Sequence, residues 1–289
     1  MDYEHLLAGK TAVVTSGAHG MGKYIAGVFA KHGALCVING MNASGEDAAE
    51  ELRVMSPESF FVRCDMSDAQ DVKNFTDTVL EQCGMVDIVV NNVGINRGDP
   101  TCAIDDERFE YTQQVNLRGL LRLARAFLPG MLNRGGVFLH ISSIHSQVAV
   151  PNNTAYASSK SGMEAFSRAL AARYGALGIR SNVICPGGIF TGNMDKVIAG
   201  LDADEARYRE LRAHCERRQP DYGNGSPYDI AHTALFLCSQ MGSRVNGATI
   251  MVDGGAVKQA HVFYERRLPP DCEERWRRTL LNKFTPVFE

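Results

Sequence analysis

The sequence predicts a single doubly wound α/β domain, built on a seven-stranded parallel sheet with helices on both faces, followed by a C-terminal extension. Two observations carry this prediction: short apolar runs alternate with helical stretches, and no repeat or low-complexity linker interrupts them. The 289 residues are 45% hydrophobic and 22% charged, a globular composition with enough chain for a substantial core. We therefore expect one domain over residues 1–256 and an extension over residues 257–289 that packs on the domain or on a neighbouring subunit.

Seven short runs rich in β-forming residues are the predicted strands. They are Thr11–Thr15, Ala34–Asn39, Phe60–Arg63, Asp87–Asn91, Gly136–Ile141, Arg180–Cys185 and Thr249–Val252. Right-handed crossovers place the C-terminal ends of parallel strands along one edge of the sheet, where doubly wound folds bind their ligands. We therefore expect the chemically important residues to follow strands.

Charge and composition narrow the classes of ligand. The net charge of −3 gives no electrostatic reason to expect nucleic acid or an anionic membrane as a partner. The first residues lack a signal peptide pattern, and no run of about 18 apolar residues occurs, so we expect a cytoplasmic protein with a small-molecule substrate. The eight cysteines form no close pairs, which predicts reduced, buried thiols and no metal site.

The segment from Thr15 to Gly22 joins the first strand to an amphipathic helix. Glycines here let the backbone turn tightly and approach a pyrophosphate, which the helix N-terminus stabilises. The predicted dinucleotide contacts in this segment are Ser16, Gly17, His19, Gly20, Met21 and Gly22.

Polar residues also follow the third and fourth strands. Asp65, with Met66 beside it, is placed to accept a hydrogen bond from an adenine amino group. Asn92, Val93 and Gly94 form a turn that brings the backbone close to a ribose. Each of these residues has an alternative interpretation as a cap or turn residue.

Tyr156 and Lys160 are four residues apart in a helix-compatible stretch, so they share one helical face. An ammonium about 4 Å from a phenol contributes up to about 4 kcal/mol toward its ionisation, which predicts a lowered tyrosine pKa. Tyr156 is the candidate acid/base, and Ser143 is placed to hydrogen-bond the same substrate oxygen. Asn116, in the expected helix Phe109–Leu128, either holds a water near Lys160 or makes a structural hydrogen bond.

Together these motifs resemble the short-chain dehydrogenase/reductase family over roughly Leu7 to Ala256. The spacings of 13 residues from Ser143 to Tyr156 and 40 from Asn116 to Tyr156 suit its single-domain branch. The resemblance implies a Rossmann fold, NAD or NADP as cofactor, and a dimer or tetramer. It also implies a catalytic tetrad of Asn116, Ser143, Tyr156 and Lys160.

The same resemblance assigns the segment after the sixth strand to the nicotinamide. Its predicted contacts are Pro186, Gly187, Ile189 and Thr191, together with Tyr156 and Lys160. Ser143, His145, Tyr156 and Phe190 are the predicted substrate contacts; for His145, a partly exposed loop histidine is the alternative. We expect Asp195–Asn224 to form a mobile lid, with a solvated helical excursion as its alternative.

Two departures from the family pattern bear on the cofactor. Ser16 stands where the glycine-rich loop has its first glycine, a change we expect to be tolerated, with Gly17 as the alternative carrier of the turn. Met41 follows the second strand, where the family has an aspartate for NAD or a basic residue for NADP. Because no aspartate repels a 2′-phosphate and His19 stands in the glycine-rich loop, NADP is slightly favoured over NAD.

These residues favour an oxidoreductase that interconverts a ketone and a secondary alcohol on a sugar, polyol or hydroxysteroid. The second alternative is a 3-oxoacyl-(acyl-carrier-protein) reductase, for which Arg134 fits one docking position and Leu177 occupies the other. The third is a non-catalytic dinucleotide-binding protein, which predicts loss of Tyr156 or Lys160, yet both are present.

Overall fold

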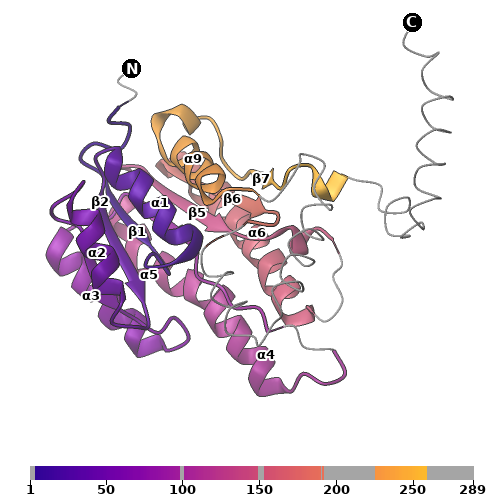
Figure 1. Ribbon diagram of the computed structural model, residues 1–289. Helices are drawn as coiled ribbons and strands as arrows, with labels where there is room; N and C mark the ends of the chain where they lie inside the picture. Colours follow the sequence, from indigo (N-terminus) through magenta and orange to yellow (C-terminus); the bar gives the residue numbers. More distant parts are fainter. Residues whose placement is uncertain (1–3, 98–100, 149–152, 190, 192–224, 259–289) are drawn as a thin grey trace, which may run out of the picture. The chain divides into compact units, whose positions relative to one another are not determined.

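The computed structural model describes residues 4–97, 101–148, 153–189, 191 and 225–258 (Figure 1). By its internal contacts the chain divides into residues 1–257 and residues 258–289, and the description below concerns the first unit. Its strands form one seven-stranded sheet in the order β3-β2-β1-β4-β5-β6-β7, and every neighbouring pair is parallel. The predicted doubly wound α/β fold is confirmed.

The strand bounds agree with the predicted runs to within one residue at each end. They are β1 (Thr11–Val14), β2 (Leu35–Gly40), β3 (Phe60–Arg63), β4 (Ile88–Asn91), β5 (Gly136–Ile141), β6 (Ile179–Pro186) and β7 (Thr249–Val252). The order reverses between β1 and β4, and doubly wound folds bind their ligands beyond the carboxyl ends of the strands at this point of the sheet.

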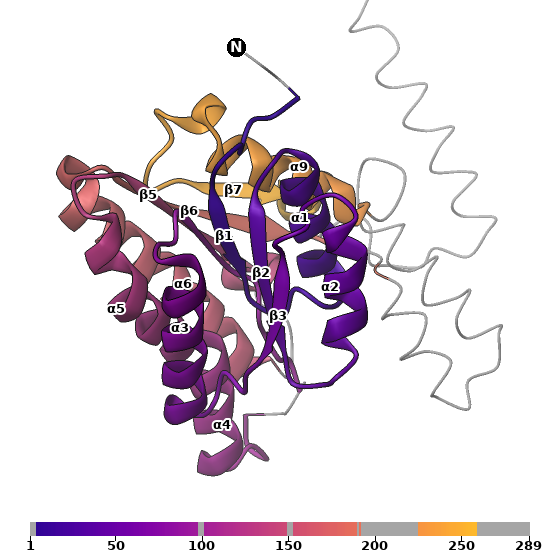
Figure 2. The same cartoon turned by 90° about the vertical axis from the view of Figure 1, so that its left-hand side faces the viewer.

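Helices cover both faces of the sheet (Figure 2). On one face lie α1 (Gly20–Lys31), α2 (Gly45–Arg53) and α9 (Pro227–Cys238). On the other lie α3 (Ala69–Cys83), α5 (Gly119–Met131) and α6 (Thr154–Tyr174), with α4 (Asp106–Gln113) leading into α5. Successive strand residues point to opposite faces of the sheet and so pack in two hydrophobic cores. Val14 packs in the core on the side of α1, α2 and α9, and Val13 in the core on the side of α3, α5 and α6.

The chain around Asn116 is not the continuous α-helix Phe109–Leu128 that we expected. A π turn, η1 (Gln114–Arg118), separates α4 from α5 and contains Asn116. A π turn inserts one extra residue into the helix and is frequent at functional sites. It leaves the apolar periodicity on either side intact, which is why the pattern did not reveal it.

Two further findings concern the predictions about membrane-spanning segments and cysteines. None of the helices in the described ranges is long and apolar enough to cross a membrane. The six cysteines in those ranges are free thiols, and four of them are buried, as expected. Cys102 is exposed, which corrects the prediction for that residue, because it lies in the loop before α4 instead of in a packed element.

Candidate active site

Ser16 forms the turn after β1. Its φ of 51° lies in the left-handed region that a β-carbon disfavours, and its N–H donates to Asn39 Oδ1 at 2.7 Å. Gly17 has no positive φ; a β-carbon there would lie 2.5 Å from the Ile38 side chain and 2.8 Å from the Val14 carbonyl oxygen. The alternative that Gly17 carries the turn is therefore wrong, because Gly17 is needed for close packing and Ser16 carries the turn.

The glycine-rich loop then opens into α1 at Gly20, whose φ is also 51°. His19 is the N-cap residue and is exposed, but its side chain makes no hydrogen bond to the first turn. The first-turn N–H groups of α1, including that of Met21, are thus left without a side-chain cap at the positive end of the helix dipole. A β-carbon on Gly22 would collide with the Ser16 carbonyl. These features fit a dinucleotide pyrophosphate.

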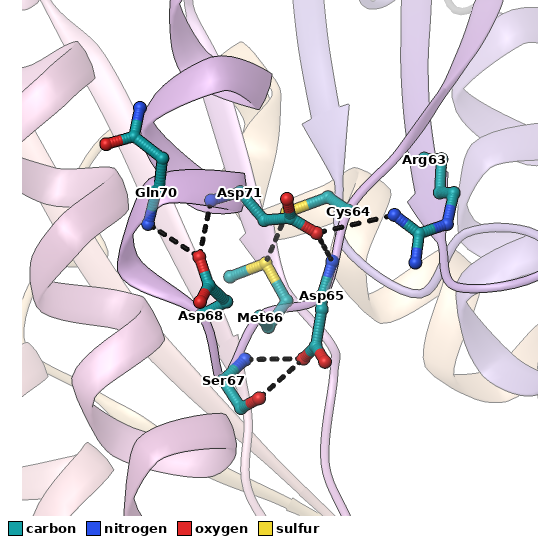
Figure 3. A network of polar contacts seen from close by, with 8 residues as sticks. All are labelled: Arg63, Cys64, Asp65, Met66, Ser67, Asp68, Gln70 and Asp71. Carbon is teal, nitrogen blue, oxygen red and sulfur yellow. Dashed lines mark hydrogen bonds and ion pairs between the residues drawn. The ribbon is translucent and has the colours of Figure 1, made fainter.

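Asp65 lies beyond the end of β3, in a network of polar contacts (Figure 3). Its Oδ1 accepts from the backbone N–H of Ser67 at 2.8 Å and from the Ser67 hydroxyl at 2.7 Å. Its own N–H donates to Asp71 Oδ2 at 3.2 Å. Asp65 Oδ2 has no hydrogen bond to any described residue, so half of the carboxylate serves the turn and half can accept from an adenine. Met66 is buried beside it.

The end of β2 supplies the ribose side of the predicted cofactor site. Gly40 has room for a side chain: a β-carbon there would make only ordinary contacts, 3.6 Å from Phe61 and 3.8 Å from Ala18. Met41 follows it and is 52% exposed. Neither position carries a charge, so no charged side chain here distinguishes the 2′-hydroxyl of NAD from the 2′-phosphate of NADP.

The loop after β4 joins the cofactor end to the chemistry end. The N–H groups of Asn92 and Val93 donate to Thr15 Oγ1 at 2.9 and 3.1 Å. A β-carbon on Gly94 would lie 3.0 Å from Lys160 Nζ, so the backbone runs close to the ammonium here and a larger residue would push on it. The three predicted residues of this turn thus bridge the glycine-rich loop and Lys160.

Tyr156, Ser143 and Lys160 come together at the end of β5. The Ser143 hydroxyl is near enough to the Tyr156 side chain to lower its pKa, and it accepts from the N–H of His145 at 3.2 Å. Lys160 is 3% exposed; its Nζ donates to the Ile141 carbonyl at 2.7 Å and lies 5.6 Å from the centre of the Tyr156 ring. The structure therefore brings together three of the four predicted tetrad residues.

The ionisation of these groups differs from the expectation. Burial raises the pKa of Tyr156, and the neighbouring Ser143 hydroxyl opposes that rise only in part. Burial lowers the pKa of Lys160 to about 8. The predicted lowering of the Tyr156 pKa by a close ammonium is wrong for the protein alone, because Lys160 points to the Ile141 carbonyl and desolvation of the phenol is the largest effect. A phenol held neutral suits a proton donor.

Asn116 is buried, and its side chain is occupied by protein contacts. Oδ1 accepts from the N–H of Ile95 at 2.8 Å, while Nδ2 donates to the Ile95 carbonyl and to Ser159 Oγ, both at 3.0 Å. This is the structural hydrogen bonding that we weighed as the alternative to holding a water. Asn116 fixes the loop after β4 against the start of α6, next to Lys160, and its place in the tetrad stays a prediction.

His145 lies beside Tyr156 in the 3₁₀ turn η2 (Ile144–Ser146). The two ring centres are 5.7 Å apart with planes at 84°, and burial lowers the pKa of His145. Its Nδ1 is buried and has no hydrogen-bond partner among the described residues. A neutral imidazole with a buried, unsatisfied nitrogen next to the phenol is able to bind a polar group of a substrate.

The predicted nicotinamide segment begins where β6 ends at Pro186. Gly187 is packed so tightly that a β-carbon would lie 2.7 Å from Asp253 Cα. Ile189 is half-buried, and so is Thr191. Phe190 and the expected lid Asp195–Asn224 lie outside the described residues.

Two residues of this site were not singled out from the sequence. Asn39, 1% exposed, donates to Met66 Sδ at 3.3 Å in addition to holding Ser16. Thr15 Oγ1 donates to the Val90 carbonyl at 3.2 Å. Both are polar residues at or just after the end of an apolar strand, and that placement was the signal available in the sequence.

Comparison with known proteins agrees with this geometry. A family model described as enoyl-(acyl carrier protein) reductase matches residues 16–257. Glucose 1-dehydrogenase 2 of Bacillus subtilis is 35% identical over 255 residues, which cover 86% of this chain and 95% of the relative. The 7alpha-hydroxysteroid dehydrogenase of Escherichia coli K12 is 33% identical over 255 residues, covering 88% and 96%.

A solved structure gives the same result. L-Sorbose reductase from Gluconobacter frateurii, complexed with NADPH and L-sorbose, superposes with a TM-score of 0.83 at 29% identity, over 89% of this chain and 99% of that one. The matches extend over nearly the whole length of these relatives. The chain belongs to the short-chain dehydrogenase/reductase family and is an oxidoreductase of that family.

Proposed function

We propose that this protein is an NAD(P)-dependent oxidoreductase that interconverts a ketone and a secondary alcohol on a hydroxylated small molecule of the sugar, polyol or hydroxysteroid class. The observation that carries the proposal is the set of groups around Tyr156: Lys160 Nζ lies 5.6 Å from the centre of its ring, the His145 ring lies 5.7 Å away, and the Ser143 hydroxyl lowers its pKa. A bound nicotinamide supplies or accepts the hydride.

The protein side of the reaction follows from the groups that meet at Tyr156. In the reducing direction the neutral phenol donates its proton to the carbonyl oxygen, and the Ser143 hydroxyl hydrogen-bonds the same oxygen. The Lys160 ammonium lies close enough to stabilise the phenolate that forms. In the oxidising direction the same phenolate takes the proton of the alcohol.

His145 supports a hydroxylated substrate over a purely apolar one. Its Nδ1 is buried without a partner among the described residues, and leaving such an atom unsatisfied costs about 1–3 kcal/mol. Because the imidazole lies beside the Tyr156 ring, a hydroxyl near the reacting carbon is placed to satisfy it. L-Sorbose, a ketose with hydroxyls next to its carbonyl, is a molecule of this kind.

The carrier-protein alternative has less support. Arg134 donates to the Gly130 carbonyl at 3.0 Å and lies 3.6 Å from Asp87, so it is engaged within the chain. Asp87 comes just before β4 begins, whereas Ser143 follows the end of β5. Arg134 is therefore at the opposite edge of the sheet from the candidate active site.

The first test is a fluorescence titration with NADH and NADPH, followed by turnover on L-sorbose, a ketosteroid, a 3-oxoacyl thioester, and the matched pair 2-hydroxycyclohexanone and cyclohexanone. We expect nucleotide binding and a preference for the hydroxylated member of the pair. Tyr156→Phe is expected to keep nucleotide affinity and to lower kcat by about 10³-fold. Turnover of the thioester alone would favour the carrier-protein alternative, and binding of neither nucleotide would refute the proposal.

A further inference from the structure

Glu164 is a buried carboxylate that the proposed reaction does not use. It lies one turn beyond Lys160 in α6, so Tyr156, Lys160 and Glu164 occupy one face of the helix. Glu164 is 4% exposed, and the ion pairs among the described residues do not include it. A charge buried without a cation is costly unless hydrogen bonds satisfy it. Its neighbours therefore decide what it does.

Three donors converge on the Glu164 carboxylate. Oε1 accepts from Ser142 Oγ and from Cys185 Sγ, both at 3.3 Å, and Oε2 accepts from Gln147 Nε2 at 2.8 Å. A carboxylate suits this position because its two oxygens accept from several donors at once. Cys185 does not compete for the charge, since burial raises the pKa of its thiol to about 11.

The donors belong to the segments that build the candidate active site. Ser142 and Gln147 stand immediately before and after the segment 143–146, which contains Ser143 and His145. Cys185 is the penultimate residue of β6, directly before the predicted nicotinamide segment. One side chain thus ties both of these segments to the helix that carries Tyr156 and Lys160.

We infer that Glu164 is a positioning residue, which holds the Ser143 hydroxyl and the His145 ring in register with Tyr156. It touches none of the reacting atoms and acts through Ser142 and Gln147. Without it, Ser142 keeps a second acceptor, the Lys160 carbonyl at 3.2 Å, and the Ser146 carbonyl still accepts from Ser161 Oγ of α6 at 3.3 Å, but the attachment through the Gln147 side chain is lost. The catalytic consequence rests on the proposed function, whereas the structural consequence does not.

The test compares two variants of Glu164 with a control. Glu164→Ala removes all three hydrogen bonds. Glu164→Gln keeps one oxygen for Ser142 and Cys185 and lets the Gln147 amide turn over and accept from the new amide nitrogen. Ser59→Ala removes another buried hydrogen bond, from the N–H of Cys36 at 3.0 Å, without touching the site.

Two readouts are measured on each full-length variant: kcat and KM with the best substrate of the panel, and hydrogen exchange of the backbone amides in residues 146–148. These amides donate to the Ser143 and Ile144 carbonyls and report on the order of η2. For Glu164→Ala we expect kcat to fall about 10- to 100-fold with the NAD(P)H dissociation constant unchanged, because small misplacements cost turnover first. We also expect exchange in this segment to accelerate about tenfold or more.

Glu164→Gln and Ser59→Ala are expected to match the wild type in both readouts. If Glu164→Ala retains kcat and exchange protection, or loses activity only in proportion to its unfolded fraction, the inference is wrong. If the exchange result holds but the wild type turns over nothing in the panel, the positioning role stands and the proposed function fails.

Discussion

Burying the Lys160 ammonium in the candidate active site lowers the stability of the folded protein, and this cost can be measured. Burial lowers the pKa of this lysine from 10.5 to about 8. The difference is about 2.5 pKa units, which at about 1.4 kcal/mol per unit means that the ammonium form costs the folded state about 3 kcal/mol. The hydrogen bond to the Ile141 carbonyl offsets part of the cost of burial. Lys160→Met removes the charge and keeps the length of the side chain.

The pH dependence has a definite sign. Because the folded-state pKa lies below that of the unfolded chain, the unfolded chain binds more protons between about pH 8 and 10.5. The stability that Lys160 contributes to the wild type is therefore present above pH 10.5 and is lost as the pH falls through 8. The advantage of Lys160→Met should be largest at pH 7 and should shrink as the pH rises toward 10.5.

Urea unfolding of the two proteins at pH 7, 8, 9 and 10 measures this. At pH 7 we expect Lys160→Met to be more stable than wild type by about 2 kcal/mol. Removing the buried ammonium gains about 3 kcal/mol, and losing its hydrogen bond to the Ile141 carbonyl costs about 1 kcal/mol. The exposed Lys31→Met is the control for loss of a lysine far from the site. A difference between Lys160→Met and wild type that is independent of pH would refute the assigned desolvation of Lys160.

Two other predictions concern the framework of the site. Ser16→Gly relieves the left-handed φ of 51° and should raise the free energy of unfolding by about 0.5–1 kcal/mol, whereas Ser16→Ala, which keeps a β-carbon, should not; a Ser16→Gly variant less stable than wild type in urea would contradict this. The Arg180 guanidinium donates to the carbonyls of Leu237, Ser239, Gly242 and Val245. Arg180→Met should lower stability by about 2–4 kcal/mol, with little recovery in Arg180→Lys because an ammonium lacks the planar fork; thermal unfolding checks it, and an Arg180→Lys protein as stable as wild type would be the opposing result.

Periodicity predicted the sheet closely because parallel strands buried on both faces are continuous apolar runs. Val13 and Val14 point into opposite cores, so no polar residue interrupts that run. The break in the helix around Asn116 was not predictable in the same way. A π turn changes hydrogen bonding without changing which residue types face the core.

The spacing of Tyr156 and Lys160 predicted that they share a helical face, but not the environment of either group. The simple charge argument gave the wrong sign for the pKa of Tyr156, because a pKa depends on burial and on where the ammonium points, and both come from distant parts of the chain. Ser16 is a similar case. Its identity was visible in the sequence, and its left-handed backbone was not.

The sequence by itself determined the fold class, the placement of the motifs after strands at one edge of the sheet, and the residue types available for chemistry, since all three follow from local periodicity and chain direction. Only the tertiary structure decided which groups share a site and how they are held. Glu164 is the clearest instance: its three partners, Ser142, Gln147 and Cys185, lie 17 to 22 residues away along the chain. Burial makes the hydrogen bonds from Ser142 and Cys185 matter, because water cannot replace a partner inside the protein.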